Sequence, residues 1–376
     1  MVGRNLLLYD IDAAAYQFAE IDSQHLMLAI ISGDKYRYTI FALGIMPVMI
    51  SGLIVQIFLA LRGTEYRTRI SPQRIKKITM IVLIIFTVIF AINHSGQLIF
   101  RESYLNLNAL KAIAVIEMTA GVLAIYKMTD LNKEYGIGGQ ATIITVNAVD
   151  GLVSTLRAYT YDELQSLLGL CVVMVVVTLI MENKLIKLPV QRVSIHNEYA
   201  DKNYIGFKLN PIGVMPVMFA MAFFMLTQLV TFGLTFLFEN HTGLKQFYEN
   251  LNLTTKTGVY VYLGIIFLLT VFFSFLLLSP GEIAEQLQKG GDSIVGIYAG
   301  KKTLWYLRRK LFMLSVFSGI VLSSLMGVAL GMSLSGEIPS AVALFPTTIM
   351  LLTGLICTLC NEITIYRKYD TYHFFI

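Results

Sequence analysis

Charged residues are scarce in this chain. They make up 14% of its 376 residues, whereas hydrophobic residues make up 56% and the mean hydropathy is +0.68. This balance excludes a soluble protein with a polar surface. The apolar residues form continuous runs and do not alternate with polar ones, which argues against a transmembrane β-barrel. The composition therefore predicts an all-α polytopic membrane protein.

Residues arranged for chemistry are also lacking. The chain has three cysteines, and the CxxC pair Cys357 and Cys360 has no second pair or histidine beside it, so we predict neither a metal site nor redox chemistry. Gly296 and Gly300 have three residues between them, whereas the two glycines of a P-loop have four, so this stretch is not a P-loop. No Ser/His/Asp or Cys/His grouping can be assembled. We therefore expect no catalytic residues, no cofactor and no enzymatic activity.

Nine apolar runs are long enough, or nearly so, to cross a bilayer, which takes about 20 helical residues. The fourth is the shortest. The runs lie at residues 41–61, 75–94, 108–127, 142–157, 163–182, 212–238, 258–278, 311–332 and 338–365.

The basic residues indicate how these spans are oriented. The net charge is +5, but the Lys and Arg are divided among loops between spans, which argues against nucleic-acid binding. The loop 62–77 is strongly basic, so we place it in the cytoplasm. Alternation then places the loops 183–211 and 279–310 inside as well, together with most of the chain's 29 Lys and Arg.

A six-residue motif occurs twice. Gly44 to Met49 (GIMPVM) returns as Gly213 to Met218 (GVMPVM), and each copy opens a long apolar run. The predicted orientation makes the first of these spans run inward and the second outward. Such an inverted repeat places a pathway where the two halves meet.

The same topology places residues 1–40 outside, although no basic stretch followed by an apolar one marks a signal peptide. The numbers of spans on the two sides of the central loop are also unequal. We therefore expect that one helix is missing from the front of this chain.

The loop 279–310 has a pattern of its own. Glu282 to Leu287 reads as a short amphipathic helix, and two glycines and a basic stretch follow it. We interpret this loop as a docking surface for an acidic cytoplasmic partner. In the next span, small residues recur every fourth position at Gly319, Ser323, Gly327 and Gly331, a stripe that permits close helix packing.

Five stretches carry a resemblance to a known family, and they occur in that family's order. They are Phe41–Pro47, Glu134–Gly138, Leu188–Gln191, Lys208–Pro216 and Ser279–Glu285. The chain resembles the SecY family of protein-conducting channels. The resemblance implies ten helices in two inverted halves, here residues 41–182 and 212–376, joined by the loop 183–211. The family's first helix would be the missing one.

The resemblance also implies a ring of apolar side chains that seals around a passing polypeptide. Carried over by motif, its members are Ile45, Met49, Ala141, Thr145, Met218 and Leu351. Residues 16–38 would form an external plug within the segment 1–40. The lateral gate for signal sequences would lie around the spans that begin near 41 and 212.

Departures from the housekeeping pattern make the chain look like the paralogue of the accessory Sec system of Gram-positive bacteria. Tyr298 stands where the family has an arginine for its motor, and the ring is small and polar at Ala141 and Thr145. This resemblance implies a channel in the bacterial plasma membrane. It would work with a SecA-type motor ATPase and export large serine-rich glycosylated adhesins. Small accessory membrane subunits stay an open question. The motor-docking residues would be Arg192, Lys289, Tyr298, Lys301 and Lys302.

Two rival readings stay open at this point. An inverted-repeat secondary transporter of a small solute would use Glu117 and Asp150, which lie within predicted spans, as coupling carboxylates. A polyprenyl-linked sugar flippase would need a basic groove in the membrane, and no Arg or Lys lies in the middle of a span.

Replacing Glu117 and Asp150 together by neutral residues distinguishes the transporter from the channel. We expect export of an unfolded secretory protein to continue, because a peptide channel does not need a proton or ion relay. Measurement of export in cells carrying Glu117→Gln and Asp150→Asn checks this. A loss of export at normal protein abundance would favour coupled transport.

Overall fold

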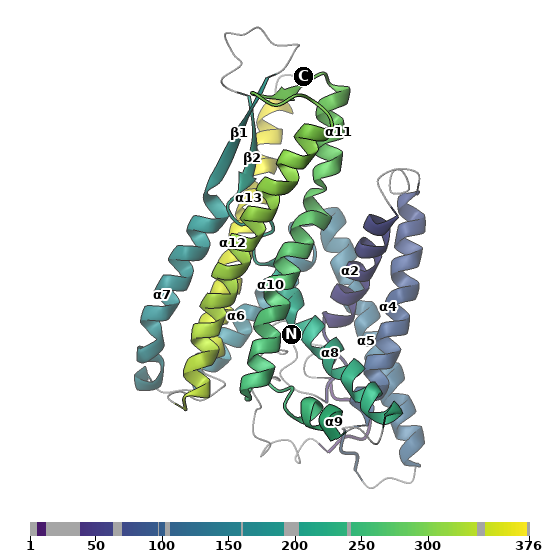
Figure 1. The fold of residues 1–376 in the computed structure, drawn as a ribbon. Coiled ribbons are helices and arrows are strands. Elements are labelled where there is room, and N and C mark those ends of the chain that lie inside the picture. Colours follow the sequence, from purple (N-terminus) through teal and green to yellow (C-terminus); the bar gives the residue numbers. More distant parts are fainter. Residues whose placement is uncertain are drawn as a thin grey trace. The chain divides into compact units, whose positions relative to one another are not determined.

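The computed structural model describes residues 6–12, 38–62, 70–96, 98–101, 106–158, 161–191, 203–238, 242–336 and 343–373 (Figure 1). The chain divides into two compact units, one of Met1–Leu168 with Met332–Ile376 and one of Gly169–Gly331. Most of the expected plug segment 16–38 falls outside the described residues, as does Arg192.

The first unit is built from antiparallel helices. They are α2 (Met46–Leu61), α4 (Pro72–Ser95), α5 (Leu107–Tyr135), α6 (Gln140–Ala158), the start of α7 (Tyr161–Asn183) and α13 (Leu344–His373). In Figure 1, α2, α4 and α5 lie side by side, and α13 packs along α6. Lys76 Nζ lies 2.6 Å from Asp130 Oδ2 and joins α4 to α5. The start of α4 and the end of α5 therefore lie side by side.

The second unit pairs α8 (Met215–Leu237) with α10 (Lys256–Leu278), and the short helix α9 (Thr242–Glu249) lies between them in the chain. Aromatic rings pack edge to face along this pair, with centroids 5.4 Å apart for Phe219 and Phe273 and 5.8 Å apart for Phe224 and Tyr262. Helix α12 (Lys301–Leu334) also packs on α10. A Cβ at Gly319 would lie 2.9 Å from Cδ2 of Phe267, and one at Gly327 would lie 3.1 Å from Cδ1 of Leu263. Two glycines of the small-residue stripe therefore bring the two helices close together.

A three-stranded antiparallel sheet, which sequence analysis did not predict, lies beside α11 (Pro280–Lys289). Strand β1 (Leu185–Gln191) pairs with β2 (Tyr204–Lys208) on one side and with β3 (Ser293–Ile294) on the other. The described parts of the two long basic loops thus fold into a single layer, which we call the cytoplasmic layer (β1, β2, β3, α11 and the first turns of α12). Its apolar core consists of Leu188, Val190, Phe207, Ala284, Leu287, Ile294 and Leu307.

Six helices in the described ranges are long and apolar enough to cross a membrane: Pro72–Ser95, Leu107–Tyr135, Met215–Thr235, Lys256–Lys289, Lys301–Leu334 and Leu344–Lys368. The predicted spans near 41 and 163 correspond to the shorter apolar helices Met46–Ala60 and Leu167–Asn183. Helix α6 covers the fourth predicted span. The helical membrane fold is confirmed, and the count of nine spans stays a prediction.

Enlarging Gly319 should separate α10 from α12. Gly319→Val places methyl groups against the Phe267 ring, and overpacking of this kind costs about 1–3 kcal/mol of stability. Gly331→Val is the matched control on the same helix, because a Cβ there meets nothing within 4 Å. We expect a lower unfolding temperature of the purified protein for the first variant only. Equal losses for both would show that the close approach at Gly319 does not limit packing.

Candidate functional site

The two copies of the repeated motif have the same backbone conformation. Gly44 has φ of +51° and Gly213 has φ of +72°, a left-handed region that favours glycine. In each copy the next residue is the helix N-cap, and methionine and proline follow at the first helical positions of α2 and α8. Proline suits this place because the first amides of a helix have no intrahelical acceptor. The sequence repeat is therefore a structural repeat.

These helix starts carry three of the expected ring residues. Ile45 and Met49 are 0% and 1% exposed at the start of α2, and Met218 is 3% exposed in the first turn of α8. Met49 and Met218 occupy equivalent places in the two motifs. Methionine is unbranched and polarizable, so it can repack around side chains of many shapes.

Ala141 and Thr145 lie in the first turns of α6, and both are half-buried. The Thr145 hydroxyl donates a hydrogen bond to the Ala141 carbonyl at 2.8 Å, so its polarity is satisfied within the helix. The turn between α5 and α6 fixes where these residues start. Asn132 Nδ2 donates to the carbonyls of Ile137, at 3.1 Å, and Gly139, at 2.7 Å. These hydrogen bonds hold Gly136 to Gly139 in a compact turn before α6.

Leu351, the sixth expected ring residue, is 2% exposed on α13. Helix α13 packs against the start of α6 closely enough that a Cβ at Gly138 would overlap Leu359. Five of the six ring residues thus belong to the first unit, and Met218 belongs to the second. The ring as an assembly stays a prediction.

The carboxylates of the transporter hypothesis have separate surroundings. Glu117 Oε2 accepts a hydrogen bond from the Tyr9 backbone N–H at 3.0 Å, which fastens the segment 6–12 to α5. Asp150 is exposed on α6. Glu117 therefore has a structural use that requires no ion relay.

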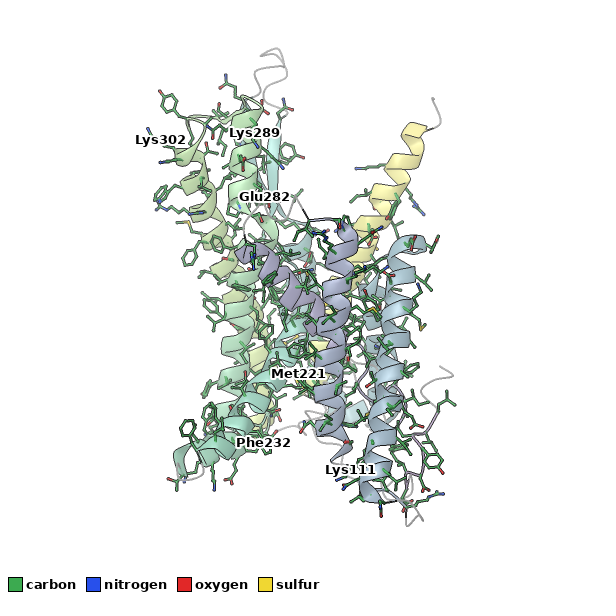
Figure 2. All side chains as sticks on the ribbon, turned by 90° about the vertical axis from the view of Figure 1, so that its right-hand side faces the viewer. Lys111, Met221, Phe232, Glu282, Lys289 and Lys302 are labelled. Carbon is green, nitrogen blue, oxygen red and sulfur yellow. The ribbon has the colours of Figure 1, made fainter. Side chains whose placement is uncertain are left out.

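The far end of the cytoplasmic layer carries the expected docking residues. Gly296 and Gly300, with φ of +79° and +101°, bracket Tyr298, whose side chain is 80% exposed. The Lys302 ammonium lies 5.3 Å from the centroid of the Tyr298 ring. Figure 2 shows Lys302 and Lys289 near this end of the layer and Glu282 closer to the membrane helices. Lys301 is exposed, and Lys289 pairs with Glu285 at 2.8 Å.

Further cation–aromatic pairs, which sequence analysis missed, follow along α12. The guanidinium carbon of Arg309 lies 5.5 Å from the Trp305 ring centroid, and Lys310 Nζ lies 5.8 Å from that of Tyr306. In each pair, as in Tyr298 and Lys302, the aromatic residue precedes the cation by four positions. Within α12 that spacing places each aromatic ring and its cation on one helix face, and it could have been read from the sequence.

The SecY family model matches residues 39–360. The chain belongs to the SecY family. The match covers the helices α2 to α12 and most of α13, including both copies of the repeated motif and the whole cytoplasmic layer. The resemblance identified from five short stretches is therefore confirmed, and the chain is a SecY-family protein-conducting channel.

Curated relatives cover nearly the whole chain. It is 27% identical to "Accessory Sec system protein translocase subunit SecY2" of Streptococcus pneumoniae serotype 4, over 99% of this chain and 93% of that protein. It is 24% identical to the protein of the same name from Leuconostoc gelidum subsp. gasicomitatum, over 96% of this chain and 90% of that protein.

A solved structure has the same fold. The chain matches "The structure of a protein conducting channel" with a TM-score of 0.67 and 16% identity, over 97% of this chain and 89% of that one. At this identity the likeness concerns the fold alone.

Proposed function

We propose that this chain is the membrane channel of an accessory Sec system, which exports unfolded secretory polypeptides across the bacterial plasma membrane. The observation that carries the proposal is its full-length similarity to proteins named accessory Sec system SecY2. Tyr298, in place of the arginine of the housekeeping pattern, also favours a specialised system.

The ring Ile45, Met49, Ala141, Thr145, Met218 and Leu351 would form the constriction of this channel. Four members are apolar, buried and at least as large as leucine, which suits a seal against water and ions. Ala141 and Thr145 leave more room, and the Thr145 hydroxyl is already satisfied. A wider waist of this kind suits large glycosylated cargo, for which we propose serine-rich adhesins.

The channel would not hydrolyse nucleotides itself. A SecA-type motor would move the cargo and would dock on the cytoplasmic layer through Lys289, Tyr298, Lys301 and Lys302. Arg192, the fifth proposed docking residue, lies outside the described residues. Exposed lysines suit an acidic motor surface, and the exposed Tyr298 ring supplies apolar contact area. Aromatic residues often dominate the energy of such contacts.

Crosslinking to a stalled export intermediate tests the channel. Photoreactive residues at Met49 and Met218 should both form adducts with the trapped chain, because both lie in the proposed constriction. Ile116 on α5 and Leu268 on α10 are matched controls, since they are 69% and 66% exposed in the middle of predicted spans. Adducts from the controls but from neither methionine would contradict a pore through the ring.

The docking surface can be tested by binding. Tyr298→Ala should weaken binding of the purified motor to the reconstituted channel by roughly tenfold, the loss expected for a central aromatic contact. Tyr260→Ala is the control, because Tyr260 is 72% exposed on the predicted external side. If Tyr298→Ala binds the motor as tightly as Tyr260→Ala and the unmodified channel do, the motor docks elsewhere.

A further inference from the structure

The turns at Gly44 and Gly213 have the same backbone conformation, but different contacts hold them in place. Around the first, the segment 38–43 packs on apolar side chains of α4 and α5, namely Ala91, Ala114 and Met118, together with Leu8 and Ile11. The carbonyl of Ile40 lies so close to Gly121 of α5 that a Cβ there would overlap it. The start of α2 therefore rests on apolar packing.

The second turn rests on an ion pair whose carboxylate is buried, while the lysine side chain is 36% exposed. Glu182, in the last turn of α7, is 2% exposed, and its Oε2 lies 3.3 Å from Lys208 Nζ. Its Oε1 lies 2.6 Å from where a Cβ of Gly213 would be. The Glu182 carboxylate thus fills the space beside Gly213 and meets Lys208 with its other oxygen.

Backbone and amide hydrogen bonds close this junction. Asn210 N–H donates to the Met181 carbonyl at 3.1 Å, and Asn210 Nδ2 donates to the Gly213 carbonyl at 2.8 Å. Helix α8 begins two residues later, and Met218 N–H donates to the Val214 carbonyl at 3.3 Å. The position of Met218 therefore depends directly on what holds Gly213.

Lys208 connects this junction to the cytoplasmic layer. It is the last residue of β2 and pairs in register with Leu185 of β1. At the other end of β1, Val190 and Gln191 pair with β3, and Val295 N–H donates to the Pro189 carbonyl at 3.2 Å. The residues after β3 form the turn that presents Tyr298. A continuous chain of contacts runs from the docking turn to Gly213.

We propose that the Glu182–Lys208 pair is a latch that joins the start of α8 to the cytoplasmic sheet and passes movement of the sheet to Met218. Glu182 and Lys208 are positioning residues, since they act through Gly213 and the first turn of α8. The role of the motor in moving the sheet rests on the proposed function. Separation of the pair would leave the buried Glu182 carboxylate without its cation, which is unfavourable, so the pair resists separation while the sheet moves.

Hydrogen exchange of the full chain in lipid nanodiscs tests the latch without a motor. Glu182→Gln and Lys208→Met should speed exchange of the Val217 and Met218 amides by at least roughly tenfold, because the first turn of α8 opens locally. Exchange of the amides paired between β1 and β2 should not change. Lys208→Arg keeps the charge and should restore slow exchange.

Lys187→Met is the control, because Lys187 lies on β1 with its ammonium 4.7 Å from the Tyr204 ring centroid. It should leave exchange at Val217 and Met218 unchanged. Unchanged exchange in both latch variants would overturn the proposal. Equally faster exchange in α8, α10 and the sheet would also overturn it, because the pair would then only stabilise the fold.

A second measurement uses the motor. In the latch variants the affinity of the motor for the channel should stay the same. The export rate at a saturating motor concentration should fall roughly tenfold or more. An unchanged export rate would show that the pair does not transmit movement. If the motor does not bind the unmodified channel at all, the proposed function fails, and hydrogen exchange alone decides the latch.

Discussion

This structure depends on one constraint: every backbone N–H and C=O group inside the hydrocarbon core must form a hydrogen bond within the protein. A bilayer core offers no water to unpaired amides and carbonyls, so the chain crosses it as helices. The special positions are where these helices begin. At Gly44 and Gly213 the chain turns through a left-handed conformation, and the proline that follows needs no hydrogen-bond partner. Residues of the expected constriction therefore sit at the starts of helices, where backbone geometry sets their positions.

The cytoplasmic layer shows how two distant loops become one structure. Neither 183–211 nor 279–310 has enough apolar residues to form a core alone, but β1 supplies Leu188 and Val190, and α11 supplies Ala284 and Leu287. Burial of these side chains against each other is the favourable term that holds β1 and α11 together. The layer then displays Tyr298 on a turn whose two glycines adopt conformations that other residues rarely adopt.

Much of this fold could be predicted because hydrophobic run length and charge placement are strong signals in membrane proteins. The helix starts that follow Gly44 and Gly213 agree with the sequence prediction, and α11 contains the short helix predicted from Glu282 to Leu287. The sheet was missed because β1 contains Pro189, and its partner β3 has only two residues about a hundred positions later. The ion pair between the buried Glu182 and Lys208 had no sequence signal, since a glutamate at a helix end is usually solvated.

Helix α12 runs unbroken for 34 residues, so it is about 51 Å long, whereas the hydrocarbon core is about 30 Å thick. The ten residues from Lys301 to Lys310 precede the predicted span 311–332 and form a segment of about 15 Å, carrying Trp305 and Arg309, that projects from the bilayer into the cytoplasmic layer. Because the helix is continuous, its cytoplasmic end moves together with its membrane-spanning part. Any change in bilayer thickness that alters its tilt would swing its outer end by several ångströms, so lipid composition could adjust the height and angle at which the Tyr298 turn is offered.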